Sequence, residues 1–442
     1  MKTSTEPQHV AMIGGGLAGS LLALELAQRG HRVDVYERRS DPRKRAGEEG
    51  RSINLGLSKR GITALTEVGL RDEVLAVAIP MEGRVIHGSD GSQRFQPYGK
   101  NRQEVLHSID RNELNDMLLD RAEAHPAVTL HFEHRCVGVD VAKREVTLEH
   151  AGGTVRIQPD WIVGADGAFS KVREEMQRGQ RANFSKEFLE WGYKELNLAA
   201  RPDGSSQLLL NALHVWPRGH CLIVSHANRN GSHTLTLFLP FEGPDSFETV
   251  KTPADVEALF AKYFPDLVPL LPHLLEQWQT HPTGTLVTTK TAPWHLNDWI
   301  VLVGDACHAV YPFYGQGMNS AFEDCVALAR ELDRQPDRRT AFRAYELARR
   351  PHTDTLAELS KDNFIELRQR VQSPWFLLRK RMDIWLNRLA PSTWLPLYTM
   401  IAHTTMPYGD ALARARRQDR LLLSAAAVGG AVVVAGVALL VT

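Results

Sequence analysis

The sequence has few cysteines, and none of them is spaced as a metal-binding or redox motif. The four are Cys136, Cys221, Cys307 and Cys325, and no two of them form a C-x-x-C pair. This scarcity argues against a structural zinc site or a disulfide framework and favours a reducing compartment. An excess of charge is also missing, because 52 basic residues balance 52 acidic ones, so we expect no nucleic-acid partner. The few, mostly polar residues before the first predicted strand do not resemble a signal or transit peptide.

Charged residues and proline are absent from residues 421–442, which read LLLSAAAVGGAVVVAGVALLVT. As a helix, a segment of this length spans about 33 Å, which matches a hydrocarbon core of about 30 Å. The alternative is a buried core helix, but such helices are normally shorter and amphipathic. We therefore expect one membrane-spanning anchor. By the positive-inside rule, the body of the chain stays cytosolic, at a bacterial inner or mitochondrial outer membrane, because four arginines precede the segment: Arg414, Arg416, Arg417 and Arg420.

A glycine-rich turn, GGGLAG, lies near the start of the chain. The predicted order is strand, turn, helix and strand, at residues 9–13, 14–19, 17–29 and 32–37. In such a unit Gly14 permits the tight turn, Gly16 lets a pyrophosphate approach the backbone, and Gly19 lets the helix pack closely on the strand. Glu37, which ends the second strand, has a carboxylate for ribose hydroxyls. The pattern predicts dinucleotide binding but does not separate NAD from FAD.

Two later motifs favour FAD. The first, GADGAFSKVR at residues 164–173, follows an apolar run that reads as a strand. The second begins with Gly304 and Asp305 after another such run and continues through Pro312 to the glycine-rich turn at residues 315–319. Asp305 stands where a carboxylate can hold a ribityl hydroxyl. The turn opens a helix, whose N-terminal amides and dipole can stabilise a reduced, anionic flavin.

The remaining patterns predict an α/β fold: a discontinuous Rossmann-like FAD-binding domain, an inserted β-sheet substrate domain and a C-terminal helical region. Alternating residues at 213–240 around an Asn-Arg-Asn-Gly turn predict an antiparallel hairpin, and residues 317–420 are mostly helical apart from breaks at Pro391 and Pro396. Strands are also expected at 128–134, 137–141 and 145–149 beside the first unit, and at 161–166 and 298–305. The expected divisions are 1–75, 100–180 and 290–330 for FAD, 76–99 and 181–289 for the substrate, 331–420 for the helical region, and 421–442 for the transmembrane helix.

The glycine motifs together resemble the aromatic-hydroxylase class of FAD-dependent monooxygenases. Further stretches narrow the resemblance to the kynurenine 3-monooxygenase family: residues 51–55, 79–81 with Arg84, 97–99, 214–218, 375–376 and 391–400. The resemblance implies bound FAD, transient NADPH and dioxygen. It also implies hydroxylation of L-kynurenine to 3-hydroxykynurenine through a flavin hydroperoxide, a step of tryptophan degradation that leads to NAD. One departure from the class is Cys307, where alanine is usual; the replacement is small, and we expect it to leave flavin binding intact.

The resemblance also implies roles for individual residues. Arg84 and Tyr98 would bind the substrate carboxylate, and Asn363 and Tyr398 would complete the amino-acid end of the pocket. Residues expected around FAD are Gly14, Gly16, Leu17, Gly19, Glu37, Arg38, Leu57, Arg111, Asp166, Asp305, Gly317, Met318 and Asn319.

Chemistry agrees with several of these roles. A carboxylate is best matched by the forked donors of an arginine, and a tyrosine adds a hydroxyl on a rigid ring. Asn363 and Glu366 share one face of a predicted helix, where the Glu366 carboxylate can pair with the substrate ammonium. Phe313 can pack on the substrate ring. No catalytic acid or base is expected among the side chains, because the neutral aniline nitrogen of kynurenine already activates the ring.

Two alternatives to this hypothesis are open. One is a related flavin hydroxylase acting on another aromatic compound or on a lipid; the pairing of Arg84 with Tyr98 speaks against a lipid. The other is a non-enzymatic, flavin-holding membrane scaffold, for which the complete 304–319 segment would have no purpose. The sequence leaves the oligomeric state open.

Overall fold

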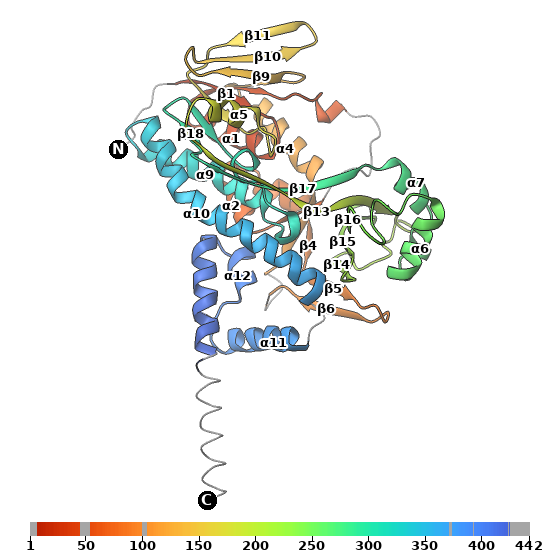
Figure 1. Ribbon diagram of the computed structural model, residues 1–442. Coiled ribbons are helices and arrows are strands. Elements are labelled where there is room, and N and C mark those ends of the chain that lie inside the picture. The colour runs from red at the N-terminus through yellow and green to blue at the C-terminus, as the bar shows by residue number, and fades with distance from the viewer. Residues whose placement is uncertain are drawn as a thin grey trace, which may run out of the picture.

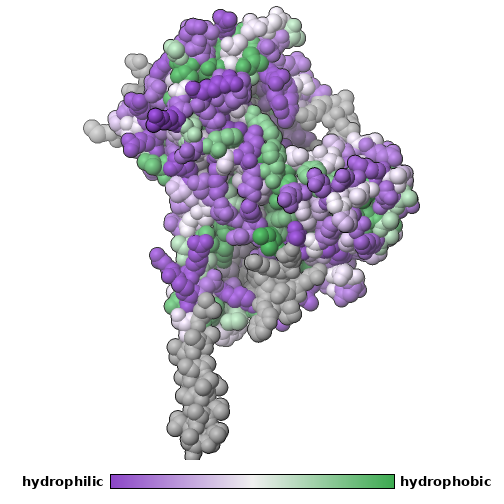
Figure 2. All heavy atoms as spheres, in the orientation of Figure 1, coloured by the Kyte–Doolittle hydropathy of each residue, from purple (hydrophilic) through white to green (hydrophobic). Residues whose placement is uncertain are grey.

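Two large sheets with helices around them form the body of the molecule (Figure 1). The computed structural model describes residues 7–44, 54–99, 104–370, 374–391, 393–422 and 424. Arg51, Ser52 and Ile53, which belong to the family resemblance, and most of the predicted anchor at 421–442 lie outside this description. Within it, no helix has both the length and the apolar character that a membrane crossing requires. The face seen in Figure 2 carries mainly hydrophilic side chains.

The first sheet has six strands in the order β18-β19-β12-β1-β2-β8. They are His295–Leu296, Ile300–Leu302, Trp161–Gly164, His9–Ile13, Arg32–Tyr36 and Val128–His131. The predicted strand–helix–strand unit is confirmed, because β1 pairs in parallel with β2 and α1 (Leu17–Gln28) connects them. The two later strands are confirmed as well, since β12 and β19 run parallel to β1. The carboxyl ends of these strands therefore meet at one edge of the sheet.

One prediction about this region was wrong. The stretches at 137–141 and 145–149 do not join the first sheet, and only β8 pairs with β2 there. Strands β9 (Arg135–Asp140), β10 (Glu145–His150) and β11 (Gly153–Ile157) form a separate antiparallel sheet. The reason is local: successive short strands joined by tight turns pair with one another before they reach a distant partner.

The second large sheet has seven strands in the order β17-β13-β16-β15-β14-β5-β6. Their bounds are Thr283–Ala292, Asn183–Leu198, His233–Pro240, Leu222–Ala227, Ala212–Pro217, Gly83–His87 and Gln93–Pro97. The predicted hairpin is confirmed by β15 and β16, which pair antiparallel across the turn at 228–231. One pair in this sheet, β14 with β5, runs parallel. Helices α6 (Pro253–Tyr263) and α7 (Leu274–Thr280) contribute to a hydrophobic core with this sheet.

Between the large sheets lies a small sheet of β3 (Asn54–Leu57), β7 (Leu106–Asp110) and β4 (Ile79–Met81). The helices α2 (Lys59–Glu67), α3 (Arg71–Val77) and α4 (Arg111–Glu123) follow its strands, and α5 (Lys171–Arg178) follows β12. The strands of the seven-stranded sheet thus come from residues 83–97 and 183–292, and the polypeptide leaves the first sheet and returns to it.

The last part of the described chain is helical, as predicted. It contains α8 (Asp305–His308), η3 (Pro312–Tyr314), α9 (Gly317–Arg334), α10 (Arg338–Ile365), the π-helical turn η4 (Glu366–Arg370), α11 (Pro374–Leu389), α12 (Leu397–Ala402) and a helix at 408–422. The predicted breaks are confirmed, because α11 ends before Pro391 and α12 begins after Pro396. Figure 1 shows α11 lying across the foot of the molecule, beside the end of helix 408–422.

Candidate active site

A cavity of about 1310 Å³ lies where the two large sheets and the C-terminal helices meet. One wall consists of the loops that follow β1, β12 and β19. The opposite wall consists of residues from the seven-stranded sheet, α10 and α12. Because this single space reaches from the glycine-rich turn to α12, it has room for a dinucleotide and a second small molecule.

The glycine-rich turn has the geometry that the sequence predicts. Gly14 has φ +109°, and a Cβ there would stand 2.4 Å from the carbonyl oxygen of Ala165. A Cβ on Gly19 would stand 2.0 Å from the carbonyl oxygen of Gly14. Gly16 differs, because it lines the cavity and a Cβ there would meet no atom within 4 Å. The space above Gly16 at the start of α1 is thus open to a ligand, and the amides of the first turn are placed where they can bind an anionic group.

Seven of the thirteen predicted flavin residues do not line the cavity, and three of them are Glu37, Arg38 and Leu57. The Glu37 carboxylate accepts hydrogen bonds from the amides of Gly15 (3.0 Å) and Arg39 (3.0 Å), so it braces the glycine-rich turn. Arg38 is exposed next to it, and Leu57 is fully buried in the hydrophobic core. The structure therefore places Glu37 beside the turn but does not bring Arg38 and Leu57 to the cavity wall.

Asp166 and Asn319 also point into the protein. The Asp166 carboxylate accepts hydrogen bonds from the Ser170 hydroxyl (2.5 Å) and from the amides of Lys171 (2.6 Å) and Val172 (3.1 Å), and burial raises its pKa. It thereby fixes the loop whose Ala165, Gly167 and Ala168 do line the cavity.

The Asn319 side chain joins two loops. Its oxygen accepts from the Ser58 amide at 2.9 Å, and its nitrogen donates to the carbonyls of Gly56 (2.8 Å) and Gly315 (3.0 Å). Since Gly56, Gly315 and Gly317 all line the cavity, Asn319 holds two parts of its wall together.

The cavity is also lined by five other residues for which flavin contacts are predicted: Leu17, Arg111, Asp305, Gly317 and Met318. The Asp305 side chain opens onto the cavity although it lies deep in the protein, and burial raises the pKa of this carboxyl while His308 and Arg111 act in the opposite direction. Gly317 begins α9, so backbone amides again border the space. This wall offers helix N-termini for anions and a carboxylate for hydroxyls, which is the donor set that FAD requires.

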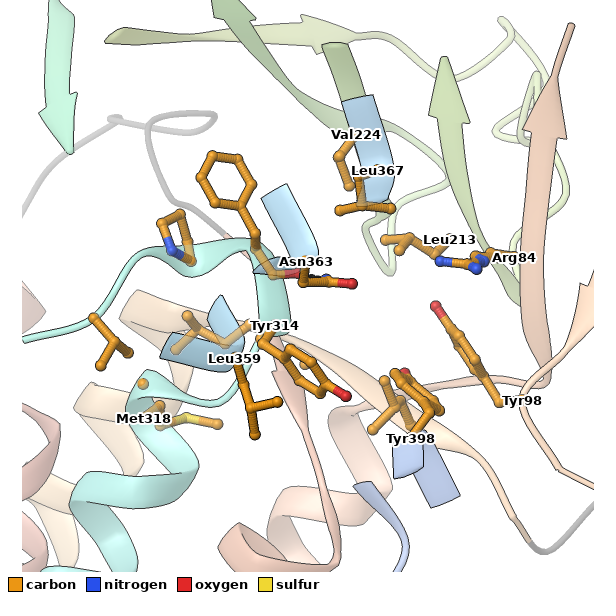
Figure 3. Close-up of a pocket in the computed structure, with 18 of the residues that line it drawn as sticks. Arg84, Tyr98, Leu213, Val224, Tyr314, Met318, Leu359, Asn363, Leu367 and Tyr398 are labelled. Atoms are coloured by element: carbon orange, nitrogen blue, oxygen red, sulfur yellow. Dashed lines mark hydrogen bonds between the residues drawn. The ribbon is translucent and has the colours of Figure 1, made fainter. Parts of the chain in front are cut away.

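At the other end, Arg84 and Tyr98 face the same space, with Tyr398 beside them (Figure 3). The rings of Tyr98 and Tyr398 stack with centroids 5.2 Å apart, and the Arg84 Nε donates to the Gln96 side-chain oxygen at 2.9 Å. Burial raises the pKa of Tyr98 to about 12 and also raises that of Tyr398. Both phenols therefore stay protonated at neutral pH, so they can donate hydrogen bonds to an anion next to the guanidinium.

Phe313, Asn363 and Glu366 also line this part of the cavity. The Asn363 side-chain nitrogen donates to the Phe313 carbonyl at 2.7 Å, which ties α10 to the loop before α9. The Phe313 ring packs against Phe364 (centroids 4.5 Å apart) and Phe238 (5.0 Å). The six predicted substrate residues thus come together from five separate segments, and a cation and a carboxylate share the space with aromatic rings.

No sequence pattern singled out Tyr314, yet its ring points into the space between Asn363 and Tyr398 (Figure 3). Its centroid lies 6.3 Å from that of Tyr398, and burial raises its pKa. The only available signal was its position next to Phe313. Side chains of the seven-stranded sheet were missed as well, because alternation along a strand does not say which face a ligand meets; they include Leu213, Val224, His226 and Phe238.

Comparison with known proteins agrees with this geometry. A family model described as "FAD binding domain" matches residues 8–360. The kynurenine 3-monooxygenase of Salinispora arenicola is 52% identical over 432 residues, covering 95% of this chain and 93% of the relative. The enzyme of the same name from Stenotrophomonas maltophilia is 44% identical over 420 residues, covering 95% and 92%.

Solved structures share the fold. The tetrameric form of 2-methyl-3-hydroxypyridine-5-carboxylic acid oxygenase has a TM-score of 0.67 at 25% identity, covering 84% of this chain and 95% of its own. Klebsiella pneumoniae HpxO, solved with FAD and uric acid, has a TM-score of 0.67 at 18% identity, covering 85% and 92%. The latter likeness is one of fold alone.

Proposed function

Since the chain belongs to the kynurenine 3-monooxygenase family of FAD-dependent hydroxylases, we propose that it converts L-kynurenine to 3-hydroxykynurenine with NADPH and dioxygen. The observation that carries the proposal is one continuous cavity whose two ends differ. Helix N-termini, Asp305 and Met318 border one end, and Arg84 with three tyrosines borders the other. The first end would hold FAD. The second end would bind the amino-acid group of kynurenine, with its aniline ring directed toward the flavin.

The residues of the cavity have separate tasks. Bound FAD supplies electron transfer from NADPH and the activation of dioxygen. Gly16, Asp305 and Gly317 would hold it, and we propose that Asp166, Asn319 and Glu37 act one step further away by fixing the loops on which those residues stand. Arg38 and Leu57 lie outside the cavity wall, so we propose no contact for them.

Arg84 and Tyr98 would hold the substrate carboxylate, and Glu366 would face the ammonium. The aromatic side chains around Phe313 would keep water from the ring. Since none of these groups has to move a proton for the aniline ring to react, positioning is the main contribution of the protein. We propose the domain division expected from the sequence on the same grounds, because Arg84 comes from the inserted sheet and Asp305 from the flavin side.

The test uses full-length, FAD-loaded protein. Addition of L-kynurenine should stimulate NADPH oxidation, and mass spectrometry should find a product that has gained one oxygen atom. A kynurenine analogue without the α-carboxylate is the matched control and should give little stimulation. NADPH oxidation that does not respond to kynurenine but responds to a phenol or to a lipid would assign the chain to a different reaction. Protein that binds no flavin would overturn the proposal.

We also propose that residues 421–442 anchor the protein in a membrane with its body in the cytosol. The support is the uncharged sequence of this segment and the exposed Arg416, Arg417 and Arg420 on the helix that leads to it. A bacterial inner membrane or a mitochondrial outer membrane fits such an anchor.

A further inference from the structure

The outward face of α11 is apolar. Leu378, Met382, Trp385 and Leu389 are 48%, 39%, 60% and 63% exposed. Their spacing of four, three and four residues puts them within an arc of roughly 60° on a helix that turns about 100° per residue. No other helix of the described part of the chain exposes more than two large apolar side chains. Single apolar residues on a surface are ordinary, but a continuous stripe marks a contact with something apolar.

The polar face of α11 points inward, which is the reverse of a helix on the surface of a water-soluble protein. The Asp383 carboxylate accepts a hydrogen bond from the Trp394 indole nitrogen (2.9 Å) and forms an ion pair with Arg379 (2.5 Å). Arg379 also pairs with Asp419, and the buried Asn387 donates to the Trp394 carbonyl. These bonds fix the rotation of the helix, so the apolar stripe cannot turn inward without breaking them.

The stripe lies where the described chain ends. Figure 1 shows α11 across the foot of the body, next to the end of helix 408–422. The Arg379–Asp419 pair joins these two helices, and Leu421, the first residue of the uncharged segment, is 65% exposed. A segment that continued helix 408–422 into a bilayer would therefore bring α11 to the bilayer surface.

Charge agrees with a lipid partner. Arg381 and Arg388 are exposed on the flank of the stripe, and Arg416, Arg417 and Arg420 are exposed at the end of the adjoining helix. Cations around an apolar stripe are typical of helices that lie in the headgroup region of anionic bilayers.

We infer that α11 is a second membrane contact, a helix that lies in the plane of the bilayer with Leu378, Met382, Trp385 and Leu389 in the lipid. The inference rests on the proposed anchor but not on the proposed reaction. It has a consequence for the site, because Asp383 and Asn387 of the same helix line the cavity. The helix that meets the lipid is thus also part of the wall around the substrate.

The test measures the surroundings of α11 in the full-length protein. Trp385→Cys carries an environment-sensitive dye, and the protein is inserted into vesicles of phosphatidylcholine and phosphatidylglycerol. The matched control is Leu347→Cys on α10, where the native side chain is equally exposed at 61%. Unmodified protein gives the labelling background, because its cysteines are buried or half-buried. We expect lipids with a nitroxide near the headgroup to quench the dye at 385 about threefold more than at 347, and aqueous iodide to show the opposite order.

Each outcome separates the proposals. If the protein floats with the vesicles but iodide quenches both positions alike, the α11 contact is wrong and the anchor stands. Protein that does not float overturns both. Protection of position 385 from both quenchers, with cross-linking between two copies, would mean that a second copy covers the stripe, and the lipid contact would again be wrong. Leu389→Cys repeats the measurement in case the first substitution disturbs α11, and the kynurenine assay reports separately on the reaction.

Discussion

Arg84 is the residue on which we expect substrate recognition to depend most, because its guanidinium faces the same cavity as the phenols of Tyr98 and Tyr398. Removing a charged partner from a buried carboxylate costs about 2–4 kcal/mol. Arg84→Ala should therefore raise the apparent KM for kynurenine roughly 30- to 1000-fold, with unchanged FAD content. Steady-state kinetics and the flavin absorbance measure the two effects.

Two controls accompany this variant. Arg84→Lys keeps the charge but loses the paired N–H donors of the guanidinium. Its KM should lie between those of the wild type and the alanine variant. Arg156→Ala removes an arginine that is 68% exposed on β11 and should change nothing. A KM within twofold of the wild type for Arg84→Ala would show that the carboxylate binds elsewhere.

Gly16 offers a second test at this scale, because a side chain there fits the empty protein but not the occupied one. A Cβ at Gly16 meets no atom within 4 Å, so Gly16→Val should fold normally. The added methyl groups would occupy the flavin position, and overpacking of about 1–3 kcal/mol lowers the FAD affinity roughly 5- to 150-fold. Titration of the apoprotein with FAD measures this change.

Gly138→Ala in β9, where the added Cβ has ordinary contacts of 3.8 Å, is the control and should leave FAD affinity unchanged. Normal FAD affinity in Gly16→Val would place the cofactor elsewhere.

Residue positions were predictable where the chemistry is local. The glycine-rich turn is formed by residues that are neighbours in the sequence. Gly14, Gly16 and Gly19 therefore have the tight turn, the open space and the close packing that were expected of them. The Asp166 carboxylate was expected at the cofactor, but the nearest unpaired amides are those at the start of α5, and these capture it. Arg84 has no local signal among 52 basic residues, and only the family resemblance selects it.

At the scale of elements, Arg60 joins α2 to the C-terminal part of the chain. Its side chain is buried, pairs with Glu323 at 2.6 Å, and donates to the carbonyls of Ile401 (2.9 Å) and Met406. Its guanidinium lies 4.0 Å from the centre of the Tyr408 ring. Arg60 therefore secures the segment that carries Tyr398.

Arg60→Met leaves a half-buried carboxylate and two carbonyls with one partner fewer, which costs about 3 kcal/mol. We expect a lower denaturation midpoint together with a higher KM for kynurenine. Lys59→Met, at the exposed neighbouring position, should alter neither quantity. If both variants unfold at the same denaturant concentration as the wild type, α12 must be held by other contacts.

The seven-stranded sheet contains buried histidines that predict a loss of stability in acid. Burial lowers the pKa of His214 to about 4, that of His226 to about 4 and that of His233 to about 3. His214 and His87 share a 2.9 Å hydrogen bond, and the Nδ1 atom of His87 lies 3.6 Å from a carboxylate oxygen of Asp266. The unfolded chain binds protons at these histidines below about pH 6.5, whereas the folded chain does not until about pH 4.

Stability should thus be complete above about pH 6.5 and fall as the pH drops from there, by up to about 1.4 kcal/mol per pH unit for each histidine. Thermal unfolding across this range measures the slope. His214→Gln should reduce the slope, whereas His273→Gln, at a site that is 70% exposed, should not. A slope that is the same in both variants would contradict a role for His214.

Elements with a strong period were predicted well, whereas the pairing of strands was predicted only in part. The hairpin at β15 and β16 follows from alternation and a turn, whereas nothing local separates β9 and β10 from β8. Which strands share a sheet depends on contacts between residues far apart in the chain, and these appear only when the core is assembled.

For the whole molecule, the anchor predicts a change of fraction on truncation. A chain that stops after Arg420 retains all the residues proposed to hold FAD and the substrate. It should therefore still bind FAD and hydroxylate kynurenine in vitro. It should move from the membrane pellet to the supernatant after centrifugation of a lysate. Retention of the truncated protein in the pellet would indicate that α11 alone is sufficient for attachment, and full-length protein that is soluble without detergent would contradict the anchor.

Arg60 contacts Ile401 and Met406, which are made 341 and 346 residues later during synthesis. The flavin side of the cavity is assembled from residues up to about 320, but its far wall requires Tyr398, which is made about 80 residues later. Until then the nascent chain has the wall that would hold the flavin but lacks the opposite wall of the cavity. Substrate recognition is therefore acquired later in synthesis than the face that would hold the flavin.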